Sequence, residues 1–585
     1  MPEPGTVTAL LDWAAGHPGM GVRLVDRSER ASSRTWEEVR ARALDVCGGL
    51  QALGIEPEQT VALVFPTGFA FLEAFFGTLL AGAVPVPLYP PARLGRLDEY
   101  HARTAAMLRS VRACVVLADP RARLILGPTI LAARPTLGCQ KLDSLPVARP
   151  GSVAVGPEDL GLVQFSSGTT VDPKPVALTH RALVTQARLL NSLWPDRPGN
   201  PHSGVSWLPL YHDMGLIGCI LPALERPGPL TLIPPEDVIA RPALWLRTIS
   251  SARATVSPAP NFAYAMCTRR VRDEELQGVD LSCWQVAING AETVVPEIVR
   301  AFSDRFARWG FKPEAMTPGY GLSEAALAVT LADPWTLFVS ERFDRAALAA
   351  GRAEPDPEGI ELMSAGTPMP GFDVAIAGPE DQLLPAGSVG RIKVRGPSLM
   401  HGYLDRPEAT ALVLRGGWLD TGDRGFRLGR QLYLTGRDKE ILILHGRNHQ
   451  PEELERAVQA VPGVRPGGVA AVAFQPEGAP TEGILLFVEV AEDAPSESRP
   501  DIAAQAGERV LAACGVRPLQ VVILEAETLP RTSSGKLRRQ AALRAHLDGT
   551  LRPPREVTTG LLVGALARSG LAYLRARHDR GDDDA

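Results

Sequence analysis

One short segment of the chain combines residue types that can hold a phosphate. Gln164–His180 reads QFSSGTTVDPKPVALTH, in which small and hydroxyl residues surround Gly168 and are followed by Lys174. We expect a strand ending at Phe165, then a loop whose backbone N–H groups wrap an anion, then an apolar helix. The Lys174 ammonium would supply a compact positive charge. The segment therefore predicts a site for a polyphosphate.

The same residues also suit an ordinary turn, so this segment alone does not separate a phosphate site from a surface loop. Its spacing differs from that of P-loop nucleotide hydrolases, in which Gly-Lys-Ser/Thr directly precedes the helix. Lysine usage favours the functional interpretation. Only six of the 61 cationic side chains are lysines, and Lys174, Lys439 and Lys536 all fall within the motifs described below. An ammonium differs from a guanidinium in shape and hydration, which favours a compact cation at these positions; the other three lysines have no such explanation.

Composition places the chain among soluble globular proteins, with 45% hydrophobic and 22% charged residues and a net charge of −5. This charge gives no electrostatic reason to expect nucleic acid as a partner. The seven cysteines are scattered without metal-ligand spacing. The longest apolar region, 71–91, contains Glu73 and ends in prolines, so we expect no transmembrane segment. The N-terminus lacks the features of a secretory signal, and we expect a cytoplasmic protein.

Helical and strand patterns alternate along the chain and predict an α/β fold. For example, Thr35 and Glu38 have capping-box spacing at the start of a helix that Gly54 can end. We expect a large N-terminal domain, 1–436, of α/β subdomains plus a β-rich subdomain. A small mobile C-terminal α/β domain, 437–550, and a tail, 551–585, follow. The tail has an amphipathic pattern that suits a carrier, a membrane or, as we expect, packing on its own protein.

Five further motifs follow the first in a fixed order: WLPLYHDMGLIG (207–218), INGAETV (288–294), PGYGLSEAAL (318–327), WLDTGDRGF with YLTGRDKEILILHGRNHQPEELE (418–455), and LPRTSSGKLRRQ (529–540). With SSGTTVDPK, they resemble the adenylate-forming superfamily of acyl-CoA synthetases, peptide-synthetase adenylation domains and luciferases. PVPLYPPARLGRLDEY, WLPLYHDMGL and GRNHQPEELE are most similar to fatty acyl-AMP ligases. The resemblance covers roughly residues 10 to 545, and the ordered set is far more specific than any single motif.

The resemblance implies a residue set for the phosphates of ATP. The β- and γ-phosphates would be held by Ser166, Ser167, Gly168, Thr169, Thr170 and Lys174. Val171 and Pro175 stand where the family often has glycine. Because proline lacks an N–H and fixes φ, the loop would be stiffer and would have one phosphate donor fewer.

The resemblance also implies nucleotide and metal contacts. In YGLSE, which we expect to begin a helix, Tyr320 and Gly321 would lie at adenine, Ser323 at the α-phosphate, and Glu324 would bind Mg²⁺. The adenine loop would comprise Asn289, Gly290 and Ala291. Asp423 would accept hydrogen bonds from the ribose hydroxyls, and Arg437 would lie near ribose and phosphate. Each assignment has a structural alternative. Glu324 would be an acid favoured by the helix dipole, Asn289 and Gly290 an ordinary Asn-Gly turn, and Asp423 and Arg437 a surface ion pair.

Three further positions follow from the resemblance. His212 would lie near the acyl carboxylate, although a lone histidine is as often structural; Asp213 belongs to the same substrate motif without an assigned role. Lys536 would enter the site during adenylation, whereas its alternative is a solvated basic turn. Lys439 would be the hinge about which the C-terminal domain rotates.

The implied activity is ATP- and Mg²⁺-dependent conversion of a medium- or long-chain fatty acid into an acyl-adenylate. The acyl group would then pass to the phosphopantetheine of an acyl carrier protein, of a polyketide or nonribosomal peptide synthase. Residues 338–366 resemble the insertion that distinguishes fatty acyl-AMP ligases and hinders the coenzyme A reaction; the alternative is a surface loop with a short Ala-rich helix. Two other functions remain open, an acyl-CoA synthetase and a non-catalytic protein that binds an adenylate or a carrier.

Overall fold

The computed structural model describes residues 4–91, 94–166, 173–196, 202–440, 442–444, 447–476, 483–532, 535–555 and 557–582. Its first unit is a parallel four-stranded sheet in the order β4-β3-β5-β6. The strands are β3 (Thr60–Val64), β4 (Val84–Leu88), β5 (Val115–Ala118) and β6 (Cys139–Gln140). The helices around it are α2 (Trp36–Ala52), α3 (Phe69–Leu80), α4 (Leu97–Ser110), α5 (Pro120–Arg123) and α6 (Gly127–Ala133). The predicted capping box of α2 is present, since the Thr35 hydroxyl accepts the Glu38 N–H and Glu38 accepts the Thr35 N–H.

A second, nine-stranded sheet has the order β17-β14-β13-β12-β11-β9-β10-β1-β2. Its strands are β1 (Gly21–Val25), β2 (Ala31–Thr35), β9 (Gly204–Ser206), β10 (Leu230–Leu232), β11 (Val256–Pro260), β12 (Val286–Gly290), β13 (Met316–Gly321), β14 (Ala328–Leu331) and β17 (Thr367–Pro368). The six central strands are parallel, and β2, β14 and β17 pair antiparallel at the edges. The candidate residues 289–290 and 320–321 end the neighbouring strands β12 and β13, where ligands bind in parallel sheets.

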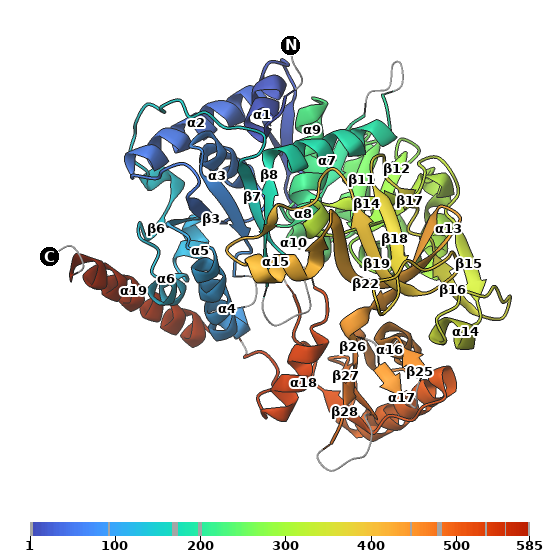
Figure 1. Cartoon of the computed structure of the whole chain (residues 1–585). Helices are drawn as coiled ribbons and strands as arrows, with labels where there is room; N and C mark the ends of the chain where they lie inside the picture. Colours follow the sequence, from blue (N-terminus) through green and yellow to red (C-terminus); the bar gives the residue numbers. More distant parts are fainter. Residues whose placement is uncertain are drawn as a thin grey trace.

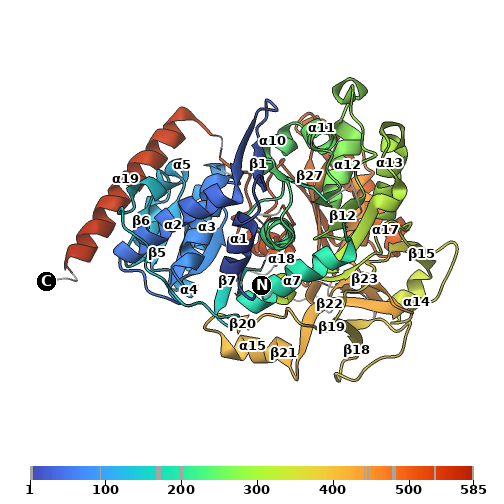
Figure 2. The same ribbon diagram turned by 90° about the horizontal axis from the view of Figure 1, so that it is seen from above.

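Helices α11 (Ala243–Ala252), α12 (Asn261–Arg270) and α13 (Pro296–Phe306) lie beside this sheet (Figure 2). Trp245, Tyr264, Trp284 and Phe302 are fully buried between them and form a chain of edge-to-face ring contacts. Such ring pairs stabilise a core beyond the area that they bury. This core fixes the strand ends on which the candidate site lies.

The phosphate-loop candidate joins two strands, and the helix expected directly after Lys174 is not there. β7 (Leu160–Phe165) pairs antiparallel with β8 (Pro175–Thr179), which pairs with β20 (Gly402–Tyr403). Helix α7 (His180–Leu193) begins only after the Thr179 cap. The run PVALT is apolar enough for either structure, and pairing on both sides selects the strand. Pro175 is tolerated because it is the first residue of its strand.

The β-rich subdomain is present as expected. It consists of β18 (Asp373–Ala377), β19 (Gly390–Arg395), β21 (Leu414–Arg415), β22 (Trp418–Leu428) and β23 (Gln431–Arg437), and the short helix α15 (Pro407–Val413) lies next to it. Residues 338–366 form more than a surface loop, since β15 (Ser340–Phe343) and β16 (Ile360–Met363) pair as a hairpin around α14 (Arg345–Ala349). Phe343 packs fully buried against Phe426 and Tyr433.

After Arg437 the chain forms a smaller unit, drawn at the bottom of Figure 1. Its elements are β24 (Leu442–Leu444), β25 (Arg447–His449), α16 (Pro451–Gln459), β26 (Val464–Phe474), β27 (Gly483–Val490), α17 (Arg499–Cys514), β28 (Gln520–Leu524) and α18 (Arg539–Leu547). Here β26-β27-β28 form one sheet and β24-β25 another. We refer to 437–550 as the C-terminal domain and to 1–436 as the large domain; these boundaries remain predictions.

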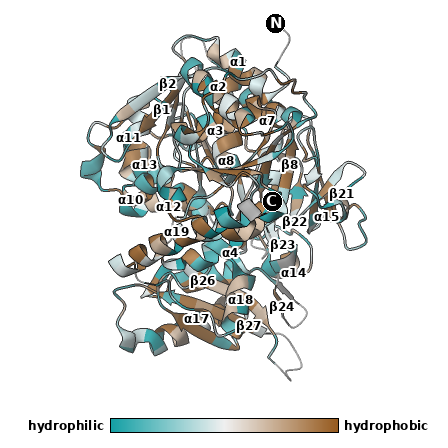
Figure 3. Cartoon of the chain, turned by 90° about the vertical axis from the view of Figure 1, so that its left-hand side faces the viewer, coloured by the Kyte–Doolittle hydropathy of each residue, from teal (hydrophilic) through white to brown (hydrophobic). Residues whose placement is uncertain are grey.

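The tail forms α19 (Thr559–Asp582), which crosses the large domain and packs on α6 at its outer edge (Figures 1 and 3). Ser569 is fully buried and its hydroxyl accepts the Gly127 N–H at 2.9 Å, while the Tyr573 hydroxyl donates to the Arg123 carbonyl at 2.9 Å. The tail thus packs on its own protein, as expected. None of the described helices is long and apolar enough to cross a membrane.

Candidate active site

Asp423 on β22 organises the side of the site assigned to ribose. Its Oδ2 accepts the Tyr320 hydroxyl at 2.7 Å, and its Oδ1 pairs with Arg437 Nε at 3.0 Å. Asp423 and Arg437 are direct partners in the β22-β23 ladder, so the backbone fixes this pairing. Burial disfavours the Arg437 charge, but Asp423 and Glu440 outweigh this effect and raise its pKa. Asp423 is 8% exposed and the Arg437 side chain is 44% exposed, so the pair lies at the edge of the site with its carboxylate turned inward.

The YGLSE motif does not begin a helix. Tyr320 and Gly321 end β13, Ser323–Ala325 form a single 3₁₀ turn, and the chain returns as β14. Ala326 adopts φ +64°, and the Leu322 N–H binds the Leu327 carbonyl at 2.8 Å, which closes the reversal. Antiparallel pairing of β13 with β14 thus overrides the helical tendency of SEAAL. The turn presents Ser323 and Glu324 at the end of the sheet.

Ser323 and Asp213 form a direct link between two motifs. The Ser323 hydroxyl donates to Asp213 Oδ2 at 2.5 Å, and Asp213 Oδ1 accepts the Met214 N–H at 2.7 Å. Both carboxylate oxygens are therefore engaged, which fixes the Ser323 hydroxyl. Asp213, for which the sequence suggested no chemical role, thereby orients the residue assigned to the α-phosphate.

Glu324 and Lys174 meet through Tyr403, a residue outside all six motifs. The Tyr403 hydroxyl donates to Glu324 Oε1 at 3.0 Å, and the Lys174 ammonium lies 4.5 Å from the centre of the Tyr403 ring. Burial raises the pKa of Glu324, which Lys174 and Arg437 oppose. The turn carrying Lys174 and the turn carrying Glu324 therefore face the same space.

Only part of the phosphate loop lies within the described residues. The Ser166 N–H donates to the Lys174 carbonyl at 3.0 Å, so the two ends of the loop meet. Ser167, Gly168, Thr169, Thr170 and Val171 lie outside the described residues. Pro175 pairs with Phe165 in the β7-β8 ladder. Its missing N–H is therefore a hydrogen-bond donor lost to the strand pairing and not to the phosphate loop. The expected loss of a phosphate donor at Pro175 therefore does not apply.

The loop carrying His212 is held against β7. Gln164 Nε2 donates to the Tyr211 carbonyl at 3.0 Å, and the chain continues into α8 (Asp213–Gly215) and a π-helical turn, Leu216–Ile220. Such π turns occur often at functional sites. Burial lowers the pKa of His212, and the Lys536 charge lowers it further against the effect of Asp213. A neutral imidazole here can accept one hydrogen bond and donate another.

The candidate adenine loop ends β12. Asn289 is fully buried and its amide donates to Asn261 Oδ1 at 3.3 Å. A side chain at Gly290 would meet the Gly319 carbonyl, because its Cβ would lie 3.2 Å from that oxygen. Ala291 is exposed and adopts φ +67°, a conformation that orients the backbone of the turn. Glu292, which the sequence reading did not single out, accepts the Phe262 N–H at 2.6 Å.

Lys536 brings the C-terminal domain into the site. A bridge between Arg531 and Leu537 closes its turn, in which the Lys536 N–H donates to the Thr532 hydroxyl at 3.0 Å. Burial and the Arg437 charge lower the pKa of Lys536, while the carboxylates of Asp213, Glu292 and Asp423 oppose them. The charges that act on the ammonium therefore come from residues of three other motifs. This environment differs from the solvated turn that was its alternative.

A small pocket shows the same convergence. Among the residues that line it are Ser166 and Pro173 from the phosphate loop, His212, and Thr532 from the C-terminal domain. Lys439 lies in the 3₁₀ turn Asp438–Glu440, directly after β23. That is the junction between the two domains, and its role as a hinge remains a prediction.

The residue set fits a single Mg²⁺ ion held mainly by its ligand. Within the described ranges, no three His, Cys, Asp or Glu side chains gather into a metal site. Glu324 is a lone carboxylate beside the phosphate loop, and Mg²⁺ is commonly bound by one or two carboxylates together with phosphates and water. The donor set therefore suits a magnesium nucleotide rather than a metal bound by protein alone.

Sequence reasoning missed Tyr403 and Glu292. Glu292 directly follows the NGA triplet and was within reach of a residue-by-residue reading. Tyr403 offered no signal, because its role arises from the pairing of β20 with β8, which brings a distant segment beside Lys174. Contacts of this kind depend on strand pairing and cannot be found by motif.

Comparisons with known proteins agree with this geometry. Residues 10–404 match the family described as AMP-binding enzyme. A putative acyl-CoA synthetase of Caulobacter vibrioides is 34% identical over 93% of this chain and 96% of its own length. The long-chain-fatty-acid–AMP ligase FadD26 of Mycobacterium marinum is 32% identical over 90% of this chain and 93% of its own.

A solved structure from a study of fatty acyl-adenylate ligases from E. coli and L. pneumophila superposes with a TM-score of 0.87. It is 32% identical and covers 93% of this chain and 98% of that one. The predicted α/β fold, the predicted resemblance and the ligase class are confirmed by these matches. This chain belongs to the AMP-binding enzyme family.

Proposed function

We propose that the enzyme activates a medium- or long-chain fatty acid with ATP and passes the acyl group to the phosphopantetheine thiol of an acyl carrier protein. In the first step a carboxylate oxygen attacks the α-phosphorus. An O–P bond forms, the bond to the α,β-bridging oxygen breaks, and pyrophosphate leaves with that electron pair. In the second step the thiol attacks the acyl carbon, its proton is lost, and AMP leaves.

The observation that supports this proposal is that the charge of Arg437 acts on both Lys536 and Glu324, while Lys174 lies beside Glu324 at Tyr403. Charge shifts across the phosphates as the α,β bond breaks, and fixed cations in a site shielded from water stabilise that shift. We assign Lys536 to the carboxylate and α-phosphate, and Lys174 to the β- and γ-phosphates. Mg²⁺, when bound at Glu324, would neutralise charge on the phosphate oxygens.

The remaining residues position the substrates. The ribose hydroxyls are assigned to Asp423, which Tyr320 and Arg437 hold in place. Adenine is assigned to Tyr320, Gly321 and the 289–291 loop, and Ser323 to the α-phosphate. A neutral His212 suits the approach of an anionic carboxylate, since it orients that group without trapping it as an ion pair. ATP as a substrate makes the cytoplasm the compartment in which we expect the reaction.

The insertion supports a carrier protein as acceptor in preference to coenzyme A. Arg345 on α14 forms an ion pair with Glu453 on α16 and donates to the Ala513 carbonyl on α17 at 2.7 Å. These contacts hold the C-terminal domain where Lys536 reaches the site. A synthetase for coenzyme A must leave this arrangement for its second step, so the insertion would disfavour that reaction. A carrier of a polyketide or peptide synthase can add protein contacts that offset the loss.

The test is a panel of fatty acids incubated with ATP and Mg²⁺ and scored by mass spectrometry for acyl-AMP. Holo-carrier protein and coenzyme A are then supplied separately. We expect acyl-AMP with at least one acid and thioester only on the carrier. Thioester on coenzyme A at a similar rate would support an acyl-CoA synthetase. No acyl-AMP and no acid-dependent pyrophosphate release would instead support a binding protein without turnover.

A further inference from the structure

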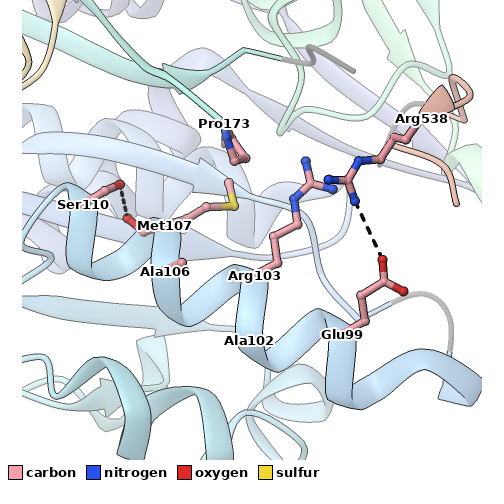
Figure 4. A pocket seen from close by; sticks show the side chains of 8 residues that line it. All are labelled: Glu99, Ala102, Arg103, Ala106, Met107, Ser110, Pro173 and Arg538. Carbon is pink, nitrogen blue, oxygen red and sulfur yellow. Dashed lines mark hydrogen bonds and ion pairs between the residues drawn. The ribbon is translucent and has the colours of Figure 1, made fainter. Parts of the chain in front are cut away.

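A second pocket, of about 260 Å³, lies between α4 and the C-terminal domain (Figure 4). It is lined by Glu99, Ala102, Arg103, Ala106, Met107, Ser110, Pro173 and Arg538. Arg103, Met107 and Pro173 also line the smaller pocket that contains Ser166 and His212. The two pockets therefore adjoin, and the larger one opens from the phosphate side of the candidate site.

Two guanidinium groups face each other across this pocket. Arg103 projects from α4 and Arg538 follows Lys536 by two residues, and Figure 4 shows their side chains approaching one another. Arg538 is 7% exposed. Burial lowers the pKa of Arg538, and the Arg103 and Arg544 charges lower it further, whereas Glu99 and Tyr89 oppose them. Two like charges that approach each other in a buried place repel, and an anion bound beside both would remove that repulsion.

The protein neutralises this pair incompletely. The carboxylate of Glu99 lies 3.7 Å from Arg538, is 48% exposed and is shared with Arg96 at 3.3 Å. The Nε atoms of Arg103 and Arg538 are both buried and have no hydrogen-bond acceptor among the described residues. A buried guanidinium nitrogen without an acceptor is strongly unfavourable.

Arg539, the next residue in the chain, is a buried arginine whose charge the protein neutralises fully. Arg539 is 8% exposed, and it binds Glu455 at 2.7 Å and Glu452 at 2.7 Å and pairs with Glu440. Two adjacent arginines are thus equally buried, but one has three carboxylates and the other faces a second arginine. What distinguishes Arg538 from its neighbour is therefore the second arginine that it faces, together with its weaker share of carboxylate charge.

We propose that this pocket is a second anion site, next to the end of the phosphate loop at Pro173, which receives inorganic pyrophosphate as it leaves the reaction, with Arg103 and Arg538 as its ligands. This inference rests on the proposed function. Planar guanidinium groups suit phosphate oxygens because they donate two parallel hydrogen bonds. Because Arg538 belongs to the C-terminal domain, the site is complete only while Lys536 is in position, and loss of the anion removes one contact that holds the two domains together.

The experiment measures the reverse reaction, ATP formation from acyl-AMP and inorganic pyrophosphate, in the full-length enzyme. We expect Arg103→Gln and Arg538→Gln each to raise the KM for pyrophosphate about tenfold, since each removes a charge-assisted contact. The forward initial rate of acyl-AMP formation at saturating ATP should stay within about threefold of wild type. Arg103→Lys, which keeps the charge, should recover part of the affinity.

Arg109→Gln is the matched control, because Arg109 lies on the same helix, is exposed and donates to the Ala132 carbonyl. Its pyrophosphate KM should equal that of wild type. The two glutamine variants lie in different domains, so misfolding of one leaves the other as a test. A pyrophosphate KM within twofold of wild type in a folded variant would overturn the proposal. So would a raised KM for holo-carrier with that for pyrophosphate unchanged, because the phosphate would then be that of phosphopantetheine.

Direct titration of inorganic pyrophosphate into the full-length protein, followed by calorimetry, separates this inference from the proposed function. If wild type makes no acyl-AMP, the proposed function fails, whereas weaker pyrophosphate binding by both variants would still support the pocket. Equal binding by wild type and both variants would overturn the pocket alone.

Discussion

The two sides of the candidate site differ in how their charges are balanced. On the large-domain side Asp423 is bound by Tyr320 and by Arg437 at the domain boundary, Asp213 by Ser323, and Glu324 by Tyr403. On the C-terminal side Lys536 and Arg538 carry cations whose pKa values burial lowers. The first side is organised by hydrogen bonds and an ion pair within the protein. On the second side the carboxylates of Asp213, Glu292 and Asp423 act on Lys536, whereas Arg538 has only the distant and shared Glu99 among the described residues. The large domain thus fixes the geometry of its carboxylates, and the C-terminal domain brings two buried cations to them.

Replacement of Lys536 should give the largest effect on activity, because it removes a cation from the C-terminal side of the site. We expect Lys536→Met to slow acyl-AMP formation on the order of 10⁴-fold, as loss of a cation at a transferred phosphoryl group does elsewhere. Transfer of supplied acyl-AMP to holo-carrier should change little, because that step breaks no phosphate bond. Lys312→Met, at an exposed lysine, is the control. Equal slowing of both steps would contradict the assignment of Lys536 to adenylation.

Replacement of Arg539 tests whether the C-terminal domain depends on a cation that three carboxylates neutralise. Arg539→Met leaves Glu440, Glu452 and Glu455 close together without their cation and should destabilise this domain by about 3–5 kcal/mol. Hydrogen exchange in 447–476 and 483–532 measures the effect locally. Arg544→Met, on the exposed face of α18, should leave exchange unchanged. Wild-type protection in the Arg539 variant would show that the carboxylates find other partners.

Low pH should reduce the stability of the large domain through His180, to which we assign no role in the reaction. His180 at the start of α7 is 1% exposed and its Nδ1 accepts the Val7 N–H at 3.1 Å; burial lowers its pKa to about 4. The unfolded chain binds a proton below about pH 6.5, so this contribution is full above that pH and is lost as pH falls towards 4. Between pH 7 and 4.5 wild type should lose about 2–3 kcal/mol that His180→Gln does not. Denaturant midpoints at both pH values measure the difference, and parallel losses would refute it.

The smallest effect should come from Tyr403. Tyr403→Phe removes the hydrogen bond to Glu324 but keeps the ring beside Lys174, and should lower kcat/KM about five- to tenfold, or about 1 kcal/mol. Tyr403→Leu removes both contacts and should cost more. Tyr433→Phe, whose hydroxyl binds Glu341 in the aromatic cluster of the insertion, is the control. Equal activity of the Phe and Leu variants would show that the ring contributes nothing.

Sequence patterns located the chemistry better than the local structure around it. Tyr320, the pair Asp423 and Arg437, and Lys536 lie in three separate motifs, and the fold brings these four residues into one region. Two helices expected after Lys174 and at Ser323 are a strand and a turn, because β8 and β14 each pair with a neighbouring strand. The local sequence cannot reveal such pairing, because the partner strand determines whether the segment becomes a strand.

The sequence also does not show which charged side chains are neutralised in the folded protein. The sequence LRR beside Lys536 suggested a solvated basic turn, yet Arg538 and Arg539 are both buried and have opposite environments. Their difference depends on α4 and α16, which lie far away in sequence. A run of like charges therefore does not reveal which of its members the protein neutralises.

The position of α19 also affects how freely the C-terminal domain can reorient. The chain enters this domain from β23 and returns to the large domain through α19, and Arg555 N–H binds the Gly95 carbonyl at 3.2 Å on the way. The domain is consequently tethered at both ends. The eleven residues between Leu547 and Thr559 can span at most about 36–40 Å when fully extended. If the C-terminal domain rotates about Lys439, as predicted, it must break the contact between Arg555 and Gly95 and stay within that length, and the tail would then limit how far the domain moves.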